Sequence, residues 1–171
     1  MKTRLVSLSA LVTLTALACA IVFAPQDMTV VRGTVVSGNL FSLSNSDDNR
    51  LVVKNGVRAS LYDNPIDIQA QVVCGQPNPR SMTLRLESSA STLGLVEYVE
   101  MFNWSLNQFQ EVYRGPITRV EVARRIDVPN GGRFTGNVGQ MRVRYWVDAR
   151  NPVMTSKWTV SLDELTWDVD F

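Results

Sequence analysis

Residues 140–148 read Gln-Met-Arg-Val-Arg-Tyr-Trp-Val-Asp, and this stretch decides the fold class. Its odd positions carry Met141, Val143, Tyr145 and Val147, and its even positions carry Arg142, Arg144, Trp146 and Asp148. Successive side chains of a β-strand point to opposite faces of the sheet. The alternation therefore predicts a strand with one apolar face in a core and one polar face outside it. The segments 81–88 and 66–72 alternate in the same way.

Turn-forming clusters divide the chain beyond Pro25 into short segments. The strongest are Asn55-Gly56, Asn64-Pro65, Gln76-Pro77-Asn78-Pro79, Gly115-Pro116, Pro129-Asn130-Gly131-Gly132 and Asn151-Pro152. Many intervals between them are close to the roughly 8–12 residues that separate turns in sandwiches and barrels. No segment keeps a helical period, apart from one expected helical turn at Leu40–Leu43. The sequence predicts an all-β domain of roughly nine or ten strands, an antiparallel two-sheet β-sandwich of the jelly-roll type.

Two strands depart from simple alternation. In the C-terminal segment the apolar positions are first even (Trp158, Val160, Leu162) and then odd (Leu165, Trp167, Val169, Phe171). The change at Asp163-Glu164 predicts a β-bulge or a strand break that keeps both halves, with Trp158 and Trp167, facing the core. The segment Leu95–Trp104 is apolar on both parities, which indicates a strand covered on both faces or one that crosses from the core to a binding surface.

Composition excludes several classes of function. The chain has 171 residues, no histidine, two cysteines and a formal net charge of +1. Without histidine there is no Ser-His-Asp triad, Cys-His dyad or histidine metal ligand. Two cysteines cannot form a four-cysteine zinc site or a disulfide-rich scaffold. The near-neutral charge also argues against a nucleic-acid partner, because such proteins neutralise many phosphates.

The N-terminus resembles a secretory signal peptide. A basic start at Met1–Arg4 precedes the apolar run Leu5–Leu17 and the small-x-small pattern Ala18-Cys19-Ala20. Cleavage is expected after Ala20, with Ala24 as a weaker second position. The predicted organisation is a signal peptide at 1–20, a short linker at 21–27 and one β-sandwich domain at 28–171.

Two alternatives remain for this segment. Residues 5–24 could span a bilayer if they were never cleaved, and Cys19 could carry a lipid, although Ala16 stands where a lipobox has leucine. Cleavage after Ala20 leaves no membrane span, and it removes two basic residues and no acid. The 17 basic residues become 15 against 16 acidic ones, a net charge of −1. Cys74 is then the only cysteine, and we expect a buried, unreactive thiol.

Paired carboxylates are the remaining catalytic option. Glycosidases of the retaining class need two carboxyl groups about 5–5.5 Å apart. Close pairs occur at Glu97 and Glu100, at Asp163 and Glu164, and at Asp168 and Asp170. The acids from Asp163 to Asp170 support the hypothesis of a carboxylate-dependent glycoside hydrolase, whereas a solvated strand face is the simpler interpretation.

A loop rich in oxygen ligands provides a candidate metal site. In the segment Ser44–Asn49, Asp47, Asp48 and Asn49 are candidate ligands for a structural calcium ion, which takes six to eight oxygens. The loop lacks the spacing of an EF-hand, and side chains of this kind also cap turns. No other cofactor is expected.

Two tryptophans are candidate ligand-binding residues. Trp146 lies on the polar face of its predicted strand, and Trp104 ends an apolar strand next to the polar stretch 105–110. Exposed aromatic rings stack on sugar faces or anchor partner proteins. The alternative is that each ring covers a sheet edge or the end of the sandwich.

Several segments together resemble a known group of proteins. They are Arg32-Gly33-Thr34-Val35-Val36-Ser37-Gly38, Leu43 to Asp48, Leu51-Val52-Val53, Met82 to Ser88, Glu100-Met101-Phe102-Asn103-Trp104 and Trp158 to Trp167. Between Thr29 and Phe171 the chain resembles poorly characterised bacterial extracellular β-sandwich modules, similar in outline to galactose-binding-like jelly rolls. The resemblance implies a secreted, non-catalytic domain and carries over no functional residues.

The sequence therefore predicts a secreted or cell-surface module, not an enzyme, that binds extracellular carbohydrate or protein. One alternative is a structural subunit of an extracellular assembly, and a second is the glycoside hydrolase described above. Neither nucleic acid nor, after signal cleavage, the membrane is an expected partner.

Overall fold

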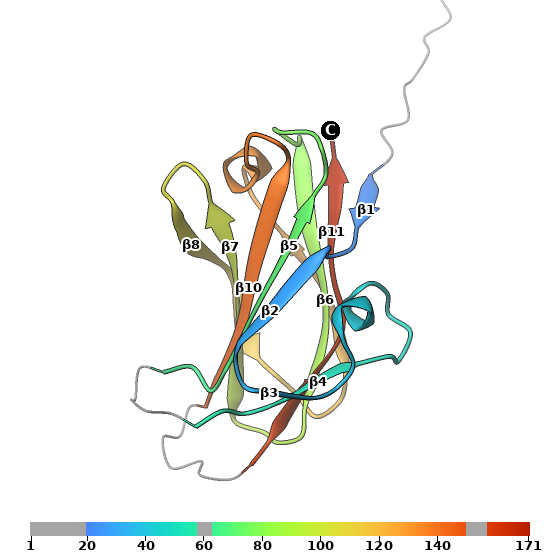
Figure 1. Cartoon of the computed structure of the whole chain (residues 1–171), viewed down its shortest axis with the longest axis vertical. Helices are drawn as coiled ribbons and strands as arrows, with labels where there is room; N and C mark the ends of the chain where they lie inside the picture. The colour runs from blue at the N-terminus through green and yellow to red at the C-terminus, as the bar shows by residue number, and fades with distance from the viewer. Residues whose placement is uncertain (1–19, 58–62, 150–156) are drawn as a thin grey trace, which may run out of the picture.

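A computed structural model describes residues 20–57, 63–149 and 157–171, so the expected signal peptide and Cys19 lie outside the described residues. The strands form two layers (Figure 1). Sheet A contains, in spatial order, β3 (Thr34–Ser37), β4 (Leu51–Lys54), β11 (Thr159–Asp170), β6 (Ser81–Ala90) and β9 (Val122–Asp127), with β1 (Ile21–Phe23) also paired to β11. Sheet B contains β2 (Asp27–Arg32), β5 (Ile66–Val73), β10 (Gln140–Ala149), β7 (Leu95–Asn103) and β8 (Gln108–Pro116).

All described pairings between these strands are antiparallel, which confirms the predicted two-sheet sandwich. Two short 3-10 helices, η1 (Leu40–Leu43) and η2 (Gly131–Phe134), interrupt the strands, and η1 coincides with the expected helical turn. In the described part of the chain no helix is both long and apolar enough to cross a membrane.

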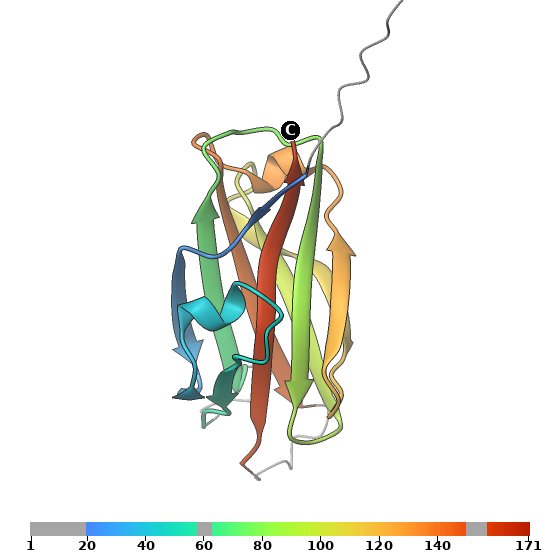
Figure 2. The ribbon, with the colours of Figure 1, turned by 90° about the vertical axis from the view of Figure 1, so that its right-hand side faces the viewer.

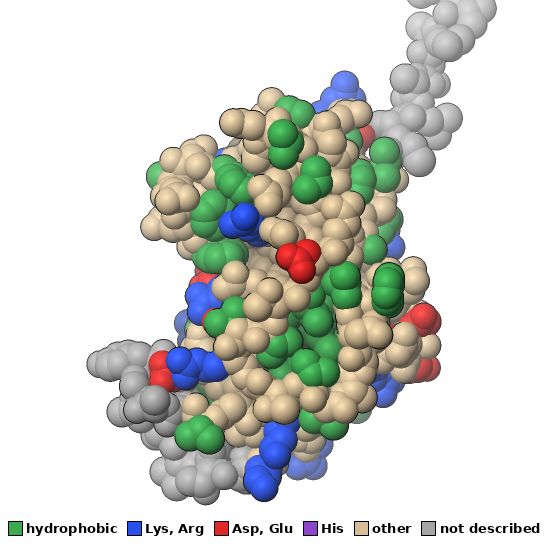
Figure 3. All heavy atoms as spheres, viewed as in Figure 1, with side chains coloured by type: hydrophobic (Ala, Val, Ile, Leu, Met, Phe, Trp, Pro, Cys, Tyr) green, Lys and Arg blue, Asp and Glu red, His purple; other side chains and the backbone are tan. Residues whose placement is uncertain are grey.

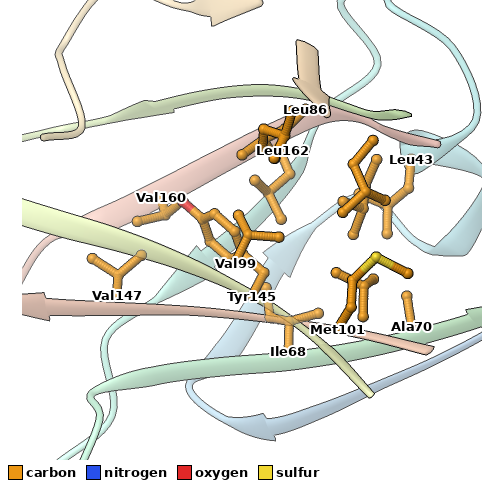
Figure 4. Close-up of a cluster of buried hydrophobic side chains, with 14 of the residues drawn as sticks. Leu43, Ile68, Ala70, Leu86, Val99, Met101, Tyr145, Val147, Val160 and Leu162 are labelled. Atoms are coloured by element: carbon orange, nitrogen blue, oxygen red, sulfur yellow. The ribbon is translucent and has the colours of Figure 1, made fainter. Parts of the chain in front are cut away.

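The core lies between the sheets and follows the predicted alternation. The inward residues of β10 and the facing residues of sheet A are buried together (Figure 4). Among them, Tyr145 and Met141 of β10 and Leu162 of β11 have no exposed surface. The outward residues of β10 are half-buried or at the surface of sheet B, as the period of two requires.

The predicted bulge is present in β11. The pairing of β11 with β6 changes register between Leu162 and Glu164, so that Asp163 is the extra residue. Leu162 and Leu165 consequently both point into the core, and Trp158 and Trp167 are buried, as expected. The bulge also redirects Asp163, whose carboxylate accepts a hydrogen bond from the Asp48 N–H at 3.0 Å.

The two outer sides of the sandwich differ. On sheet A, η1 packs against β11 (Figure 2), and Thr166 on that side is fully buried. Asn39 fixes the start of η1 because its side chain accepts from the Phe41 N–H while Ser42 accepts from the Asn39 N–H. On sheet B, by contrast, the outward residues of the central strand β10 are all half-buried.

Residues 21–27 are not a linker. Residues 21–23 form β1, which pairs with β11 at Ile21–Val169 and Phe23–Trp167, and β2 already begins at Asp27. β4 pairs with only the first residues of β11, so β1 supplies hydrogen-bond partners further along the same edge. A run of three apolar residues is too short to show a period of two, and here it directly follows another apolar run.

Cys74 is half-buried rather than buried. Its sulfur lies 3.1 Å from the carbonyl oxygens of Gln76 and Gly139, and it packs at the margin of the core. The expected small hydrophobe is therefore found at the end of β5, where the sheet gives way to a loop.

β7 is covered on both faces near its start, as its mixed pattern indicated, and it carries a charge into the core. Glu97 has no exposed surface and lies among inward-facing residues. Its Oε2 accepts hydrogen bonds from Ser88 (2.7 Å) and Tyr145 (3.1 Å), and Arg124 forms an ion pair with its Oε1 at 3.0 Å. Burial raises the pKa of Glu97, although these three partners oppose the shift.

The first prediction concerns this pKa. Because the pKa of Glu97 is raised above 4.5 in the folded protein, the folded state keeps this proton to a higher pH than the unfolded chain. The contribution of Glu97 to the free energy of unfolding should therefore fall as pH rises from about 4.5 through the folded pKa. Glu97→Gln cannot titrate, so urea unfolding across this window should show the wild type losing stability relative to the variant. Parallel stability curves would contradict the assignment.

The second prediction concerns β1. A chain that begins at Pro25 lacks the β1–β11 pairing and the edge contact between Phe23 and Phe171, whose ring centroids are 6.5 Å apart. We expect it to lose about 2 kcal/mol relative to a chain that begins at Ile21, or about 4–8 °C in Tm for a domain of this size. Equal Tm values in thermal unfolding would show that β1 contributes nothing to the fold.

Candidate functional site

Both predicted tryptophans lie on the outer side of sheet B. Trp146 is opposite Tyr98 in the β10–β7 pairing, and Trp104 directly follows β7. Trp104 is six residues after Tyr98, or about 20 Å away along the direction of the strand. We call the surface between them the sheet B strip, formed by Asp67, Tyr98, Glu100, Phe102, Trp104, Phe109, Arg114, Arg142, Arg144 and Trp146. Hydrophobic, basic and acidic side chains are intermixed on this side of the molecule (Figure 3).

One end of the strip is a stack of planar groups. The rings of Tyr98 and Trp146 are parallel within 4°, with centroids 3.6 Å apart, and the guanidinium of Arg114 lies 4.8 Å from the Tyr98 centroid. Cross-strand aromatic pairs of this kind hold each other in place. Tyr98 is only 8% exposed, whereas Trp146 is half-buried, and its indole nitrogen is buried without an acceptor among the described residues.

The other end is a cluster of edge-to-face rings. Phe102 lies 5.0 Å from Trp104 and 5.3 Å from Phe109, with interplanar angles of 76° and 78°. The guanidinium of Arg142 lies over Phe102 and Trp104, at 5.7 and 5.2 Å from the ring centroids. Within the described residues Arg142 forms no ion pair with a carboxylate, and its Nε is buried without a hydrogen-bond partner.

Charged side chains join the two aromatic ends. Arg144 donates to both oxygens of Asp67, with Nε–Oδ1 at 3.0 Å and Nη2–Oδ2 at 2.6 Å, and its Nη1 lies 3.2 Å from Glu100 Oε2. The hydrogen bond with Asp67 is the main cause of a raised pKa of Arg144. These contacts connect β5, β10 and β7, and they fix Arg144 as a structural part of the strip.

A small hollow adjoins Arg142 on the β2 side of the strip. Its other lining groups include Asp27, Thr29, Gln69 and Gln71, and its volume is about 80 Å³. Gln71 donates to Asp27 at 3.0 Å. Because small-molecule pockets are usually about 300–1,000 Å³, this surface suits a ligand that lies across the sheet.

Sequence reasoning missed these polar residues, although one signal was available. Gln69 and Gln71 share the outward parity of β5, and the register pairs them with Thr29 and Asp27 of β2. The alternation in the sequence shows that Gln69 and Gln71 point outward, but it does not show that β2 pairs with β5.

A group of acidic side chains lies on the other side of the sandwich. One carboxylate oxygen from each of Asp48, Glu121 and Asp163 lies within 4.8 Å of the others. Arg50 Nη2 is 2.5 Å from both Asp48 Oδ1 and Glu121 Oε2. Two oxygens, Glu121 Oε1 and Asp163 Oδ1, are buried without a hydrogen-bond donor in the described structure. Burial is the main cause of a raised pKa of Glu121. Arg50 lowers this pKa, whereas the charges of Glu87 and Asp163 raise it further.

The expected calcium ligands are therefore only partly brought together. Asp48 belongs to the acidic cluster of Asp48, Glu121 and Asp163. Asp47 instead accepts from the Asn49 N–H at 3.0 Å, and Asn49 accepts from Ser42 at 3.4 Å, so both stabilise the loop. Glu121 and Asp163 were missed because the fold brings them from distant segments, although the phase change at 163 marked an unusual residue. Oxygen ligands with two unsatisfied oxygens suit a hard cation such as Ca²⁺.

The third prediction concerns this cluster. We expect Ca²⁺ to raise Tm because it would relieve repulsion among carboxylates, and ten times the Kd would add about 1.4 kcal/mol. Asp163→Asn should abolish the calcium-dependent shift, whereas Asp47→Asn, in the same loop but outside the cluster, should retain it. Identical melting curves in Ca²⁺ and in chelator would show that Arg50 alone balances the cluster.

Two of the acids proposed for hydrolysis, Asp163 and Asp168, lie far apart along β11. Asp168 Oδ2 accepts from Arg85 at 2.6 Å and from Arg125 at 3.1 Å on the outer side of sheet A. Asp163 lies five residues away in the bulge, about 17 Å along an extended strand. Neither geometry of glycosidase carboxylates, about 5–5.5 or 6.5–9.5 Å, fits this pair.

Comparison with known proteins identifies the architecture. No protein-family model and no curated protein sequence matches the chain. Among solved structures, the chain is similar to a CBM4 carbohydrate-binding module at 9% identity, with a TM-score of 0.50 over 83% of this chain and 77% of that chain. It is also similar to a CBM61 module in complex with β-1,4-galactotriose, at 10% identity and a TM-score of 0.50 over 84% and 87% of the two chains. The expected resemblance to jelly-roll β-sandwich modules is thus confirmed at the level of the fold.

Proposed function

We propose that the protein is a non-catalytic, secreted or cell-surface module that binds carbohydrate on the sheet B strip. The observation that carries the proposal is the arrangement of aromatic rings at both ends of the strip, with hydrogen-bonding groups between and beside them. Sugar rings have apolar faces that pack on aromatic rings and hydroxyl groups that bind amides, carboxylates and guanidinium groups.

The distribution of charge favours carbohydrate over a protein ligand. Protein interfaces have an apolar centre that is depleted of charge. On the strip, however, Arg144, Asp67 and Glu100 occupy the middle, and the aromatic groups lie at the ends. The similar CBM61 module, which was solved with a galactotriose, supports the same class of ligand. The expected signal peptide supports export.

A non-catalytic role agrees with the chemistry of the chain. Histidine is absent from the whole sequence, and Asp168, one of the carboxylates considered for hydrolysis, is held by Arg85 and Arg125. The groups on the strip can hold a polyhydroxylated ligand, and its two carboxylates, Asp67 and Glu100, are both held by Arg144.

The fourth prediction tests this function by affinity electrophoresis in gels that contain soluble polysaccharides, among them β-1,4-galactan. The wild type should be retarded by at least one of them. Trp146→Ala should weaken binding at least tenfold, because aromatic anchors in a binding surface contribute about 2 kcal/mol or more. Arg142→Ala should also weaken it.

Phe41→Ala is the matched control for this experiment. Phe41 is 75% exposed on η1, on the outer side of sheet A, so its replacement removes an exposed aromatic ring without touching the strip. Equal retardation of Trp146→Ala and the wild type, or a Phe41→Ala defect as large as that of Trp146→Ala, would reject the strip as the binding site.

A further inference from the structure

A second hollow lies at one end of the sandwich, where three connections meet. It has a volume of about 330 Å³, and its lining includes Asn78, Trp104, Ser105, Thr135, Gly136 and Asn137. These residues come from the β5–β6, β7–β8 and β9–β10 connections. We call this feature the end hollow. Its volume falls in the usual range for small-molecule sites.

The lining of the end hollow is polar but uncharged. Asn78, Asn137, Ser105, Thr135 and Trp104 contribute to it, and none of its described lining residues is Lys, Arg, Asp or Glu. A phosphate or carboxylate ligand would need a charged partner when it leaves water. The chemistry therefore selects a neutral ligand with many hydroxyl groups.

Local contacts hold the hollow in shape. The backbone N–H of Trp104 donates to the Arg133 carbonyl at 2.9 Å. The indole packs closely on Gly136, where a Cβ would lie 3.1 Å from the ring and would displace it by a few tenths of an ångström. Asn103 accepts from the N–H groups of Ser105 and Leu106 at 2.9 and 3.1 Å. A preformed site loses little entropy on binding.

Trp104 also belongs to the sheet B strip, through Phe102 and Arg142. Its indole nitrogen is buried, and no described side chain or backbone group accepts its proton. An unsatisfied buried donor is costly. Trp104 thus lines both the sheet B strip and the end hollow, and its indole N–H lacks an acceptor among the described residues.

We infer that the end hollow is a second carbohydrate subsite, which binds one neutral pyranose residue and is joined to the sheet B strip by Trp104. The inference rests on the proposed function, because it assigns the end hollow to the same class of ligand. A chain that lies along β7 and β10 would reach the end hollow past Trp104.

The test uses ¹H–¹⁵N NMR titrations with free galactose, glucose and N-acetylglucosamine as separate probes. At least one sugar should shift the amide signals of Asn78, Ser105, Gly136 or Asn137. Asn137→Lys, which places a charged chain in the hollow, should raise the Kd of that sugar at least tenfold. Val138→Lys is the matched control, because Val138 is 63% exposed beside the hollow and is not among its lining residues.

The outcomes separate this inference from the proposed function. Trp146→Ala should lose polysaccharide binding but retain the monosaccharide shifts in the end hollow. If the wild type binds polysaccharide and no probe shifts the four loop signals, or if Val138→Lys weakens binding as much as Asn137→Lys, the end hollow is not a subsite although the strip stands. If the wild type binds neither polysaccharide nor monosaccharide, both proposals fail.

Discussion

The period of two along β10 is the constraint on which the rest of the structure depends. Met141, Val143, Tyr145 and Val147 are fully buried between the sheets, and their burial forces the intervening residues onto the outer side of sheet B. A shift of one residue in pairing would exchange the two faces and place arginines in the core. The hydrophobic core therefore also positions Arg142, Arg144 and Trp146 on the strip.

The chain balances its charges in three different ways. On the strip, Arg144 forms short contacts with Asp67 and Glu100, so that three strands share one cation. In the core, Glu97 depends on Arg124, Ser88 and Tyr145, and removing one partner from such a buried group usually costs about 3–5 kcal/mol. The acidic cluster remains incompletely balanced, because Arg50 contacts some of its oxygens and leaves others without a donor. This difference is why we expect a cation at the cluster and not at the other two groups.

The sequence was most informative where a local pattern determines the outcome. Alternation placed Trp146 on the outer face, the phase change located the bulge at Asp163, and the cap residues produced the turn at 40–43. It failed where the outcome depends on which strands are neighbours. The partner of Trp146 is Tyr98, whose strand is apolar on both parities, and Glu121 meets Asp163 only because the β8–β9 connection passes over the bulge. β1 escaped notice because three residues carry no readable period. The short reach of sequence patterns explains each of these limits.

The four tryptophans of the chain provide the most direct test of the central claim. Two contribute to the strip, Trp104 and Trp146, and two are buried in the core, Trp158 and Trp167. Indole ¹H–¹⁵N signals of the labelled protein should be followed while a polysaccharide that the protein binds is added. The account predicts that the signal of Trp146, and with it that of Trp104, shifts or broadens selectively while those of Trp158 and Trp167 keep their positions. A polysaccharide that binds without changing the Trp146 signal would contradict the account.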